Sequence, residues 1–154
     1  MLDKVDFPLT TSQISEFILD KGYTTYFRLQ SALSELTASS LLKVEATHNR
    51  TLYQLTEEGA ETIHYFKNKI SPDIREEIDT FLVEKMYDLR EEVSVKSDYY
   101  LNTNHEFEVK CEILENGSNL IDLRLTVPTE KEAQAIVSNW NLKNQEIYTS
   151  LLMK

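Results

Sequence analysis

The side chains best suited to chemistry lie on one face of a segment expected to be helical, from Thr25 to about Thr37. On a helical wheel, the face opposite Leu29 carries a guanidinium group, an amide and several hydroxyl groups. These groups suit hydrogen bonding to nucleic acid: arginine binds phosphate or guanine, glutamine can pair with adenine, and serine adapts to either. A phenyl ring could contact a thymine methyl group, but it equally suits a protein contact. The candidate contacts on this segment are Thr25, Phe27, Arg28, Gln30, Ser31 and Ser34.

A second polar group lies at the tip of an expected hairpin, in Thr47–Arg50. His48, Asn49 and Arg50 are the candidates there, since a cation at such a tip can lie against the minor groove or the phosphate backbone. Plainer interpretations stay open for both groups. The helical face can be an ordinary solvated surface, and the tip a generic turn.

The sequence carries no catalytic signature. Its three histidines show no metal-ligand spacing with one another or with the single cysteine, Cys111. With three glycines, the chain has no glycine-rich phosphate loop. Glu106, Glu108 and Glu112 alternate as the solvent face of a strand does, and Cys111 alternates with them as a small core residue. We therefore expect no enzyme, metal site or cofactor.

The elements that must position the candidate residues begin with a helix near Thr10. The Thr10-x-x-Gln13 pattern is a capping box, and Ile14, Phe17 and Ile18 follow at helical spacing. Lys21-Gly22 ends the helix with a cation and a glycine. A short turn then leads into the second helix, which has three leucines expected to face the core: Leu29, Leu33 and Leu36.

A β-hairpin follows, with alternating segments Leu42–Ala46 and Thr51–Leu55 on either side of the polar tip. Thr56 can cap a further helix over residues 57–70, whose apolar side would carry Ala60, Ile63, Phe66 and Ile70. Two helices joined by a short turn and followed by a hairpin and a helix predict a winged helix-turn-helix, whose second helix is the candidate recognition helix.

These residues also carry a family resemblance. The motif is Thr10-x-Ser12-x-Ile14, Leu29-x3-Leu33-x2-Leu36, Leu41-Leu42 and Tyr53-x-Leu55-Thr56-x2-Gly59. Residues 1–69 resemble the winged-helix transcriptional regulators of the PadR-like and MarR-like kind, and the whole chain resembles a family of short, uncharacterised bacterial winged-helix proteins. The resemblance implies DNA binding. The sequence departs from it at Ser40, where such proteins commonly carry glycine.

The rest of the chain predicts a linking helix and a small module. Ser71-Pro72 starts a helix that ends near Glu92, and its apolar stripe would pack on its own domain or on a second subunit. Strands follow near 93–101, 105–115 and 119–127, with the hairpin signal Asn116-Gly117 between the last two. Thr129 then caps a final helix that would cover the sheet with apolar side chains: Ile136, Val137, Trp140, Ile147, Tyr148 and Leu151.

The expected fold is therefore α+β in three parts. These are a winged helix-turn-helix over 1–69, a linking or dimerisation helix over 70–92, and an antiparallel three-stranded sheet with a helix over 93–154. Before Pro8 only a short apolar run, Met1, Leu2 and Val5, is available for the first helix of such a domain. We expect that a preceding segment is missing and that an apolar patch is left partly uncovered.

Charge argues against strong DNA binding. The chain carries a net charge of −10, but residues 1–55 hold five lysine or arginine residues against six acidic ones. Most of the excess acid therefore lies away from the helix-turn-helix, which predicts weak, salt-sensitive association. No apolar run approaches the ~20 residues that span a bilayer, and no signal peptide is evident, so we expect a cytoplasmic protein.

The sequence thus favours a DNA-binding transcriptional regulator, a homodimer built mainly from residues 70–154, that binds double-stranded DNA. Its C-terminal module would dimerise or sense a small-molecule effector that the sequence does not identify. The alternative is a winged-helix protein-interaction module without DNA binding, which the acidity and Phe27 support.

Overall fold

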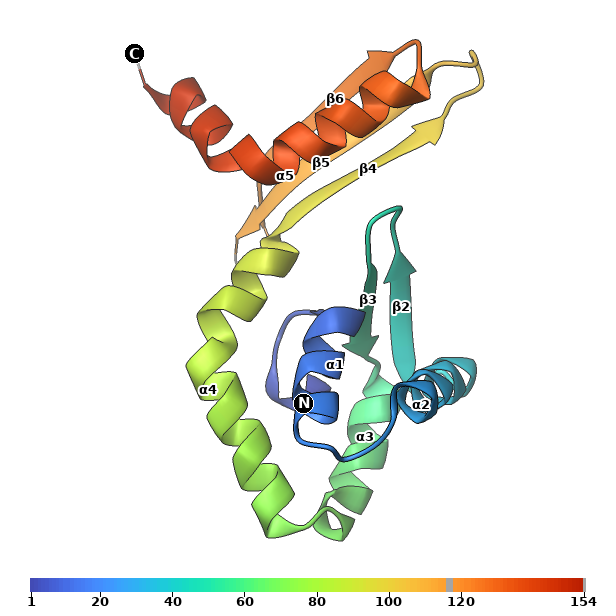
Figure 1. Ribbon diagram of the computed structural model, residues 1–154, viewed down its shortest axis with the longest axis vertical. Coiled ribbons are helices and arrows are strands. Elements are labelled where there is room, and N and C mark those ends of the chain that lie inside the picture. The colour runs from blue at the N-terminus through green and yellow to red at the C-terminus, as the bar shows by residue number, and fades with distance from the viewer. Residues whose placement is uncertain (116–117, 154) are drawn as a thin grey trace. The chain divides into compact units, whose positions relative to one another are not determined.

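The computed structural model of the chain describes residues 1–115 and 118–153 (Figure 1). Within them the fold is mixed α+β, with five α-helices and two three-stranded antiparallel sheets. The elements are η1 (Leu2–Lys4), β1 (Leu9–Thr10), α1 (Thr11–Asp20), α2 (Tyr26–Ala38), β2 (Leu42–Ala46), β3 (Thr51–Leu55), α3 (Glu57–Phe66), η2 (Lys67–Lys69), α4 (Pro72–Ser94), β4 (Val95–Leu101), β5 (Phe107–Glu115), β6 (Ser118–Val127) and α5 (Glu130–Leu152), where η marks a short 3₁₀ helix.

The chain divides into two compact units. Unit 1 comprises Met1–Ala46 and Arg50–Val93, and unit 2 comprises Thr47–Asn49 and the chain from Ser94 onward. The break at residues 93 and 94 places nearly all of α4 with the N-terminal elements. The hairpin tip, residues 47–49, groups with unit 2.

The sheet of unit 1 has the order β1-β3-β2, so β3 is its central strand. In the β2–β3 hairpin Leu42 lies opposite Leu55, and on the other side of β3 Leu9 lies opposite Tyr53. The helices α1 and α2 precede this hairpin and α3 follows it (Figure 1).

The predicted capping box at Thr10 and Gln13 is confirmed. The Gln13 backbone N–H donates to Thr10 Oγ1 at 3.1 Å, and the Thr10 N–H donates to Gln13 Oε1 at 2.9 Å. The Gln13 amide also donates to the Leu89 carbonyl at 3.1 Å and to the Glu92 carboxylate at 2.8 Å. One buried glutamine therefore caps α1 and fastens it to α4.

The core of unit 1 includes the apolar stripe of α4, which packs on its own unit. Helix α4 contributes four buried residues, and α1, α2 and the sheet contribute most of the others. Its buried members are Phe7, Leu9, Ile14, Phe17, Leu29, Leu33, Leu42, Leu52, Ile78, Leu82, Leu89 and Val93.

Gly59 allows α3 to pack closely on the segment before β2. A Cβ atom added at Gly59 would lie 2.2 Å from the Leu41 carbonyl oxygen and 2.8 Å from Leu55 Cδ1. The Leu41 carbonyl also accepts hydrogen bonds from the backbone N–H and side-chain hydroxyl of Thr56, the residue that caps α3. This contact gives a physical reason for the glycine of the Tyr53-x-Leu55-Thr56-x2-Gly59 motif.

In unit 2 the sheet has the order β4-β5-β6, and α5 lies across one of its faces (Figure 1). Thr129, the predicted cap, starts α5 and forms a capping box with Glu132. Asn116 and Gly117, the predicted hairpin signal, lie outside the described residues, but the strands on either side of them pair antiparallel. The core holds Tyr99, Val109, Cys111, Ala133, Val137 and Trp140.

Three local predictions were wrong. Leu36, expected in the core, is 39% exposed, and Leu151, expected to cover the sheet, is 72% exposed. The helix expected over 57–70 ends at Phe66, and a 3₁₀ turn follows it. Leu36 and Leu151 each lie near a helix end, where apolar spacing continues beyond the surface that the helix packs on.

No described helix is long and apolar enough to cross a membrane.

Candidate nucleic-acid interface

Helix α2 presents most of the predicted contact residues to solvent. Thr25 is its N-cap, and Thr25, Arg28, Ser31 and Ser34 are all exposed. Ser31 Oγ donates to the Glu35 carboxylate at 3.1 Å, one helical turn away. Arg28 forms no salt bridge with any described residue. A guanidinium group on an open helix face can therefore reach an anionic partner without first breaking an internal ion pair.

Gln30 differs from its neighbours on α2 because it is half-buried. Its Nε2 atom is buried and finds no hydrogen-bond partner among the residues that the structure describes. A buried, unpaired amide is costly, typically about 1–3 kcal/mol. Gln30 can therefore read a base only if its side chain swings outward on binding.

The start of α2 also exposes two aromatic rings. Phe27 is 84% exposed and Tyr26 is 53% exposed, and their ring centroids lie 5.9 Å apart at an interplanar angle of 77°. The sequence pattern singled out Phe27 but missed Tyr26. A tyrosine beside an outward phenylalanine at the helix start was the available signal.

Arg50 is fastened within unit 1. Its Nη1 donates to the Glu92 carbonyl at 2.5 Å, in the last turn of α4, where a cation stabilises the unpaired carbonyl groups of the helix end. Burial lowers the pKa of the Arg50 guanidinium, whereas Glu92 and Glu45 raise it. In this arrangement Arg50 stabilises the fold. A DNA phosphate could bind its guanidinium only by replacing the helix carbonyl.

The other two tip residues belong to unit 2. His48 Nδ1 lies 2.5 Å from Asp98 Oδ1, and the His48 ring stacks on Tyr99 with centroids 4.0 Å apart. The Asn49 N–H lies 3.4 Å from Thr47 Oγ1, within the turn. The structure thus leaves the α2 residues other than Gln30 on an open face, whereas His48 and Arg50 are held by contacts with the protein itself.

Lys43 is a further exposed cation that the sequence pattern did not select. It lies on β2 opposite Gln54, on a strand in which every residue after Leu42 is exposed. The alternation already assigned Lys43 to the solvent, because it follows the buried Leu42. What the alternation did not predict is Val44, which is 41% exposed.

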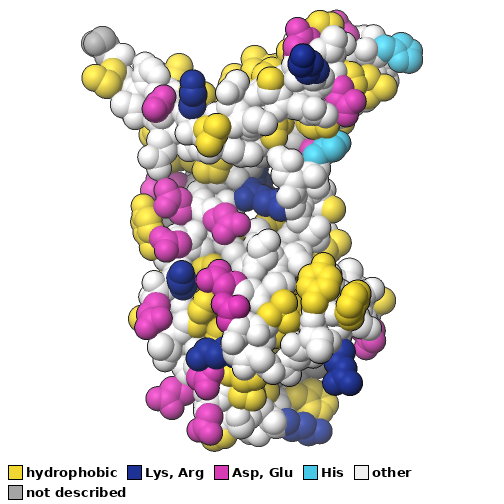
Figure 2. All heavy atoms as spheres, in the orientation of Figure 1, with side chains coloured by type: hydrophobic (Ala, Val, Ile, Leu, Met, Phe, Trp, Pro, Cys, Tyr) yellow, Lys and Arg dark blue, Asp and Glu magenta, His cyan; other side chains and the backbone are white. Residues whose placement is uncertain are grey.

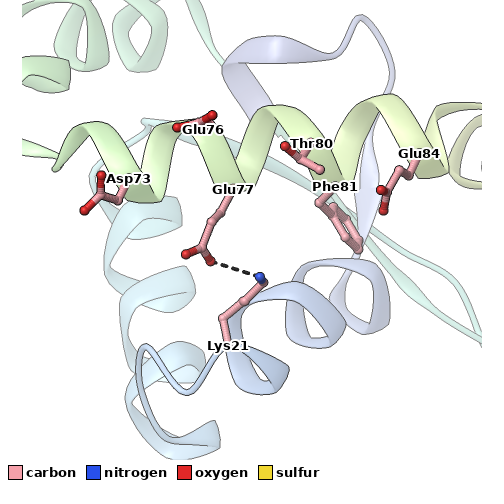
Figure 3. A pocket seen from close by; sticks show the side chains of 7 residues that line it. All are labelled: Lys21, Asp73, Glu76, Glu77, Thr80, Phe81 and Glu84. Atoms are coloured by element: carbon pink, nitrogen blue, oxygen red, sulfur yellow. Dashed lines mark ion pairs between the residues drawn. The ribbon is translucent and has the colours of Figure 1, made fainter.

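The exposed side of α4 is acidic. Acidic side chains follow α4 in Figure 2, and a pocket of about 360 Å³ lies between α4 and the end of α1 (Figure 3). Lys21 Nζ lies 3.1 Å from the Glu77 carboxylate, and the Tyr23 hydroxyl donates to the same group at 2.6 Å. This bond raises the pKa of Tyr23 to about 12. The pocket is lined by Lys21, Asp73, Glu76, Glu77, Thr80, Phe81 and Glu84.

Unit 1 also contains an apolar pocket of about 340 Å³, with walls from η1, α1, α2 and α3. The exposed Leu36 and Phe66 lie in its lining, and Asp3 and Thr62 are among the few polar residues there. Its walls thus offer few groups that could bind a charged ligand.

Within residues 1–115 and 118–153, no cluster of histidine, cysteine and acidic side chains could hold a metal ion. Cys111, predicted to be a core residue, is fully buried.

Comparison of the chain with curated proteins and with solved structures gave no match. A family model does match, over residues 1–154. The chain therefore belongs to the family described as a domain of unknown function, DUF4364.

Proposed function

We propose that this protein is a DNA-binding transcriptional regulator of the winged helix-turn-helix type that acts as a homodimer. The order of α1, α2, the β2–β3 hairpin and α3, with β1 added to the hairpin, supports a winged-helix assignment for unit 1. In this assignment α2 is the recognition helix, which enters the major groove.

The observation that carries the proposal is the open, hydrogen-bonding face of α2. Thr25, Arg28, Ser31 and Ser34 are exposed on one helix, and no described acidic residue neutralises Arg28. Such a mixture suits both phosphate positioning and base contacts. The acidic side of α4 would repel phosphate, so DNA would approach unit 1 by the α2 face.

A gel-shift titration with DNA from upstream of the protein's own gene, over a series of salt concentrations, tests the proposal. We expect a shifted band whose apparent affinity is weak, because few phosphate contacts must offset a net charge of −10, and falls as salt rises, because binding releases counterions from the phosphates. Absence of any shift at low salt with upstream or unrelated DNA would contradict the proposal.

The second candidate is a protein-interaction module, favoured by the exposed Tyr26–Phe27 pair. Aromatic side chains are enriched at protein interfaces. The acidity of the chain also disfavours binding to DNA. Phe27→Ala separates the two functions: it should abolish capture of a protein partner, yet on DNA it should cost at most the contact with one thymine methyl group.

A further inference from the structure

Strand β6 is a long edge strand. It runs over ten residues, Ser118–Val127, and among the described residues β5 is the only strand that pairs with it. Every second residue of an edge strand directs its backbone N–H and C=O groups outward, which makes the edge a template for another strand. Typical strands have about 5–6 residues, so this edge is long.

The apolar face of the sheet is incompletely covered at β6. On β5, Val109 and Cys111 are fully buried under α5. Their partners on β6 are Leu125, which is 37% exposed, and Leu123, which is half-buried. Apolar burial therefore decreases from β5 towards the open edge, as expected where a neighbouring strand and its helix would continue the layer.

The opposite face of the sheet carries a mismatch of charge. Lys110 of β5 lies directly opposite Arg124 of β6, and Glu112 lies directly opposite Asp122. Like charges at opposite positions destabilise a sheet. The Lys110–Glu112 pair relieves this on β5 at 2.8 Å, but Arg124 lies 3.7 Å from both Asp122 and Glu108. Arg124 therefore has only these two longer ion pairs, and both Asp122 and Arg124 keep a like charge directly opposite on β5.

We propose that β6 pairs antiparallel with β6 of a second copy of this chain, with the two-fold axis through Leu123. In this register Asp122 lies opposite the partner's Arg124, and Arg124 lies opposite the partner's Asp122. On the other face, Leu123 meets the partner's Leu123 and Ile121 meets the partner's Leu125. The two sheets become one six-stranded sheet, and the exposed apolar edge is buried.

Charge selects this register. A shift of two residues, which keeps the apolar side chains on one face, places Asp122 opposite the partner's Asp122 or Arg124 opposite the partner's Arg124. The other edge strand, β4, is a poorer candidate. Its Ser97 and Tyr99 are already buried, and its Asp98 binds His48. This inference deepens the proposed function by naming the dimer surface, but its test requires no DNA.

Charge reversal tests the proposal, with molar mass measured by light scattering at tens of micromolar protein. The wild type should have twice the mass of one chain. The single variants Asp122→Arg and Arg124→Asp should each shift towards the mass of the monomer. Their dimer dissociation constants should rise roughly ten-fold or more, because each substitution places two like-charged pairs across the two-fold axis. Each substitution removes a like-charge pair from the β5–β6 ladder but also breaks an exposed ion pair of Arg124. The two effects oppose each other, so the fold should be retained, which circular dichroism checks.

Two results would demonstrate the pairing itself. The double variant Asp122→Arg with Arg124→Asp should recover the dimer, and an equimolar mixture of the two single variants should form a heterodimer. Lys143→Asp, on an exposed position of α5, makes the same change of charge as Arg124→Asp and should leave the dimer unchanged. A monomeric wild type, or single variants that stay dimeric, would overturn the proposal. Failure of both the double variant and the mixture to dimerise would overturn it equally, whatever the outcome with DNA.

Discussion

At the residue scale, Gly59 is a position where one added atom would meet the protein's own backbone. Gly59→Ala should destabilise unit 1 by about 1–3 kcal/mol, because the new methyl group meets the backbone oxygen of Leu41 and neither backbone can easily withdraw. The free energy of unfolding, measured by urea denaturation, checks this.

Gly22→Ala is the matched control. Gly22 has a φ of 68° but no atom within 4 Å of an added Cβ, so the cost there is the left-handed backbone alone, about 1 kcal/mol. If Gly59→Ala is no more destabilising than Gly22→Ala, the close contact of α3 with Leu41 is not present in solution.

Ser40 occupies the position just after α2 where the resembling regulators carry glycine, and its φ is 58°. Ser40→Gly should stabilise the protein by about 0.5–1 kcal/mol, because glycine adopts this conformation without strain. The strain energy removed exceeds the free-energy cost of ordering glycine, which is the more flexible residue in the unfolded chain. The backbone bonds at this position, such as the Thr56 hydroxyl to the Ser40 carbonyl at 2.8 Å, do not depend on the side chain.

Thermal unfolding measures the gain, expected at a few degrees or less. Ser39→Gly, at a φ of −85°, should give no gain, since serine is unstrained there. Equal effects at the two positions would show that strain at Ser40 is not the cause.

Burial should make the Cys111 thiol inert. It raises the pKa of Cys111 to about 11, so at pH 8 almost no thiolate is present, and the thiolate is the reactive form. A chromogenic disulfide reagent should label the folded protein slowly, at the rate at which the core opens, and the guanidinium-unfolded protein at once. Rapid labelling of the folded protein would contradict the burial of Cys111.

At the element scale, most helix starts and the strand pairs follow from local sequence signals. The capping residues Thr10, Thr56 and Thr129 each start a helix, because a side-chain oxygen at the N-cap satisfies a free backbone N–H. The hairpin of β2 and β3 has the predicted bounds, since its alternation is clear and its tip is polar.

Contacts between distant elements could not be predicted in this way. Arg50 reaches the end of α4, and Gln13 reaches Leu89 and Glu92, across separations that no local period encodes. The exposure of the candidate residues on α2 could therefore be predicted from helical spacing, except at the half-buried Gln30. At the tip of the hairpin it could not, because long-range partners hold those side chains.

This difference gives a prediction that separates α2 from the hairpin tip. Arg28→Ala should weaken DNA binding and leave stability unchanged, because Arg28 is exposed and has no internal salt bridge. Ser34→Ala should cost roughly 1–3 kcal/mol on the preferred sequence and little elsewhere if Ser34 reads a base.

Arg50→Ala should instead lower the free energy of unfolding, by about 1 kcal/mol or more, because it removes a charged donor from the Glu92 carbonyl. Fluorescence anisotropy with labelled DNA and urea denaturation measure the two quantities. An unchanged stability with a loss of DNA affinity that is uniform across sequences would place Arg50 among the phosphate contacts instead.

At the scale of the whole molecule, the distribution of charge defines the functional proposal. The net charge of −10 disfavours binding to DNA, yet residues 1–55, which hold α2 and the hairpin, are nearly neutral. The acidic residues concentrate in α4 and beyond it. A dimer would hold two copies of α2 in one molecule, and pairing of half-sites would offset the weak attraction of each copy.

The central claim is that unit 1 binds DNA through α2. The most direct measurement compares DNA affinity, over a series of salt concentrations, for the wild type, Arg28→Glu on α2 and Lys85→Glu on α4. We predict salt-sensitive binding by the wild type, its loss in Arg28→Glu and its retention in Lys85→Glu, which makes the same change of charge on the acidic side of the unit. Absence of binding by the wild type, or equal losses in the two variants, would contradict the claim.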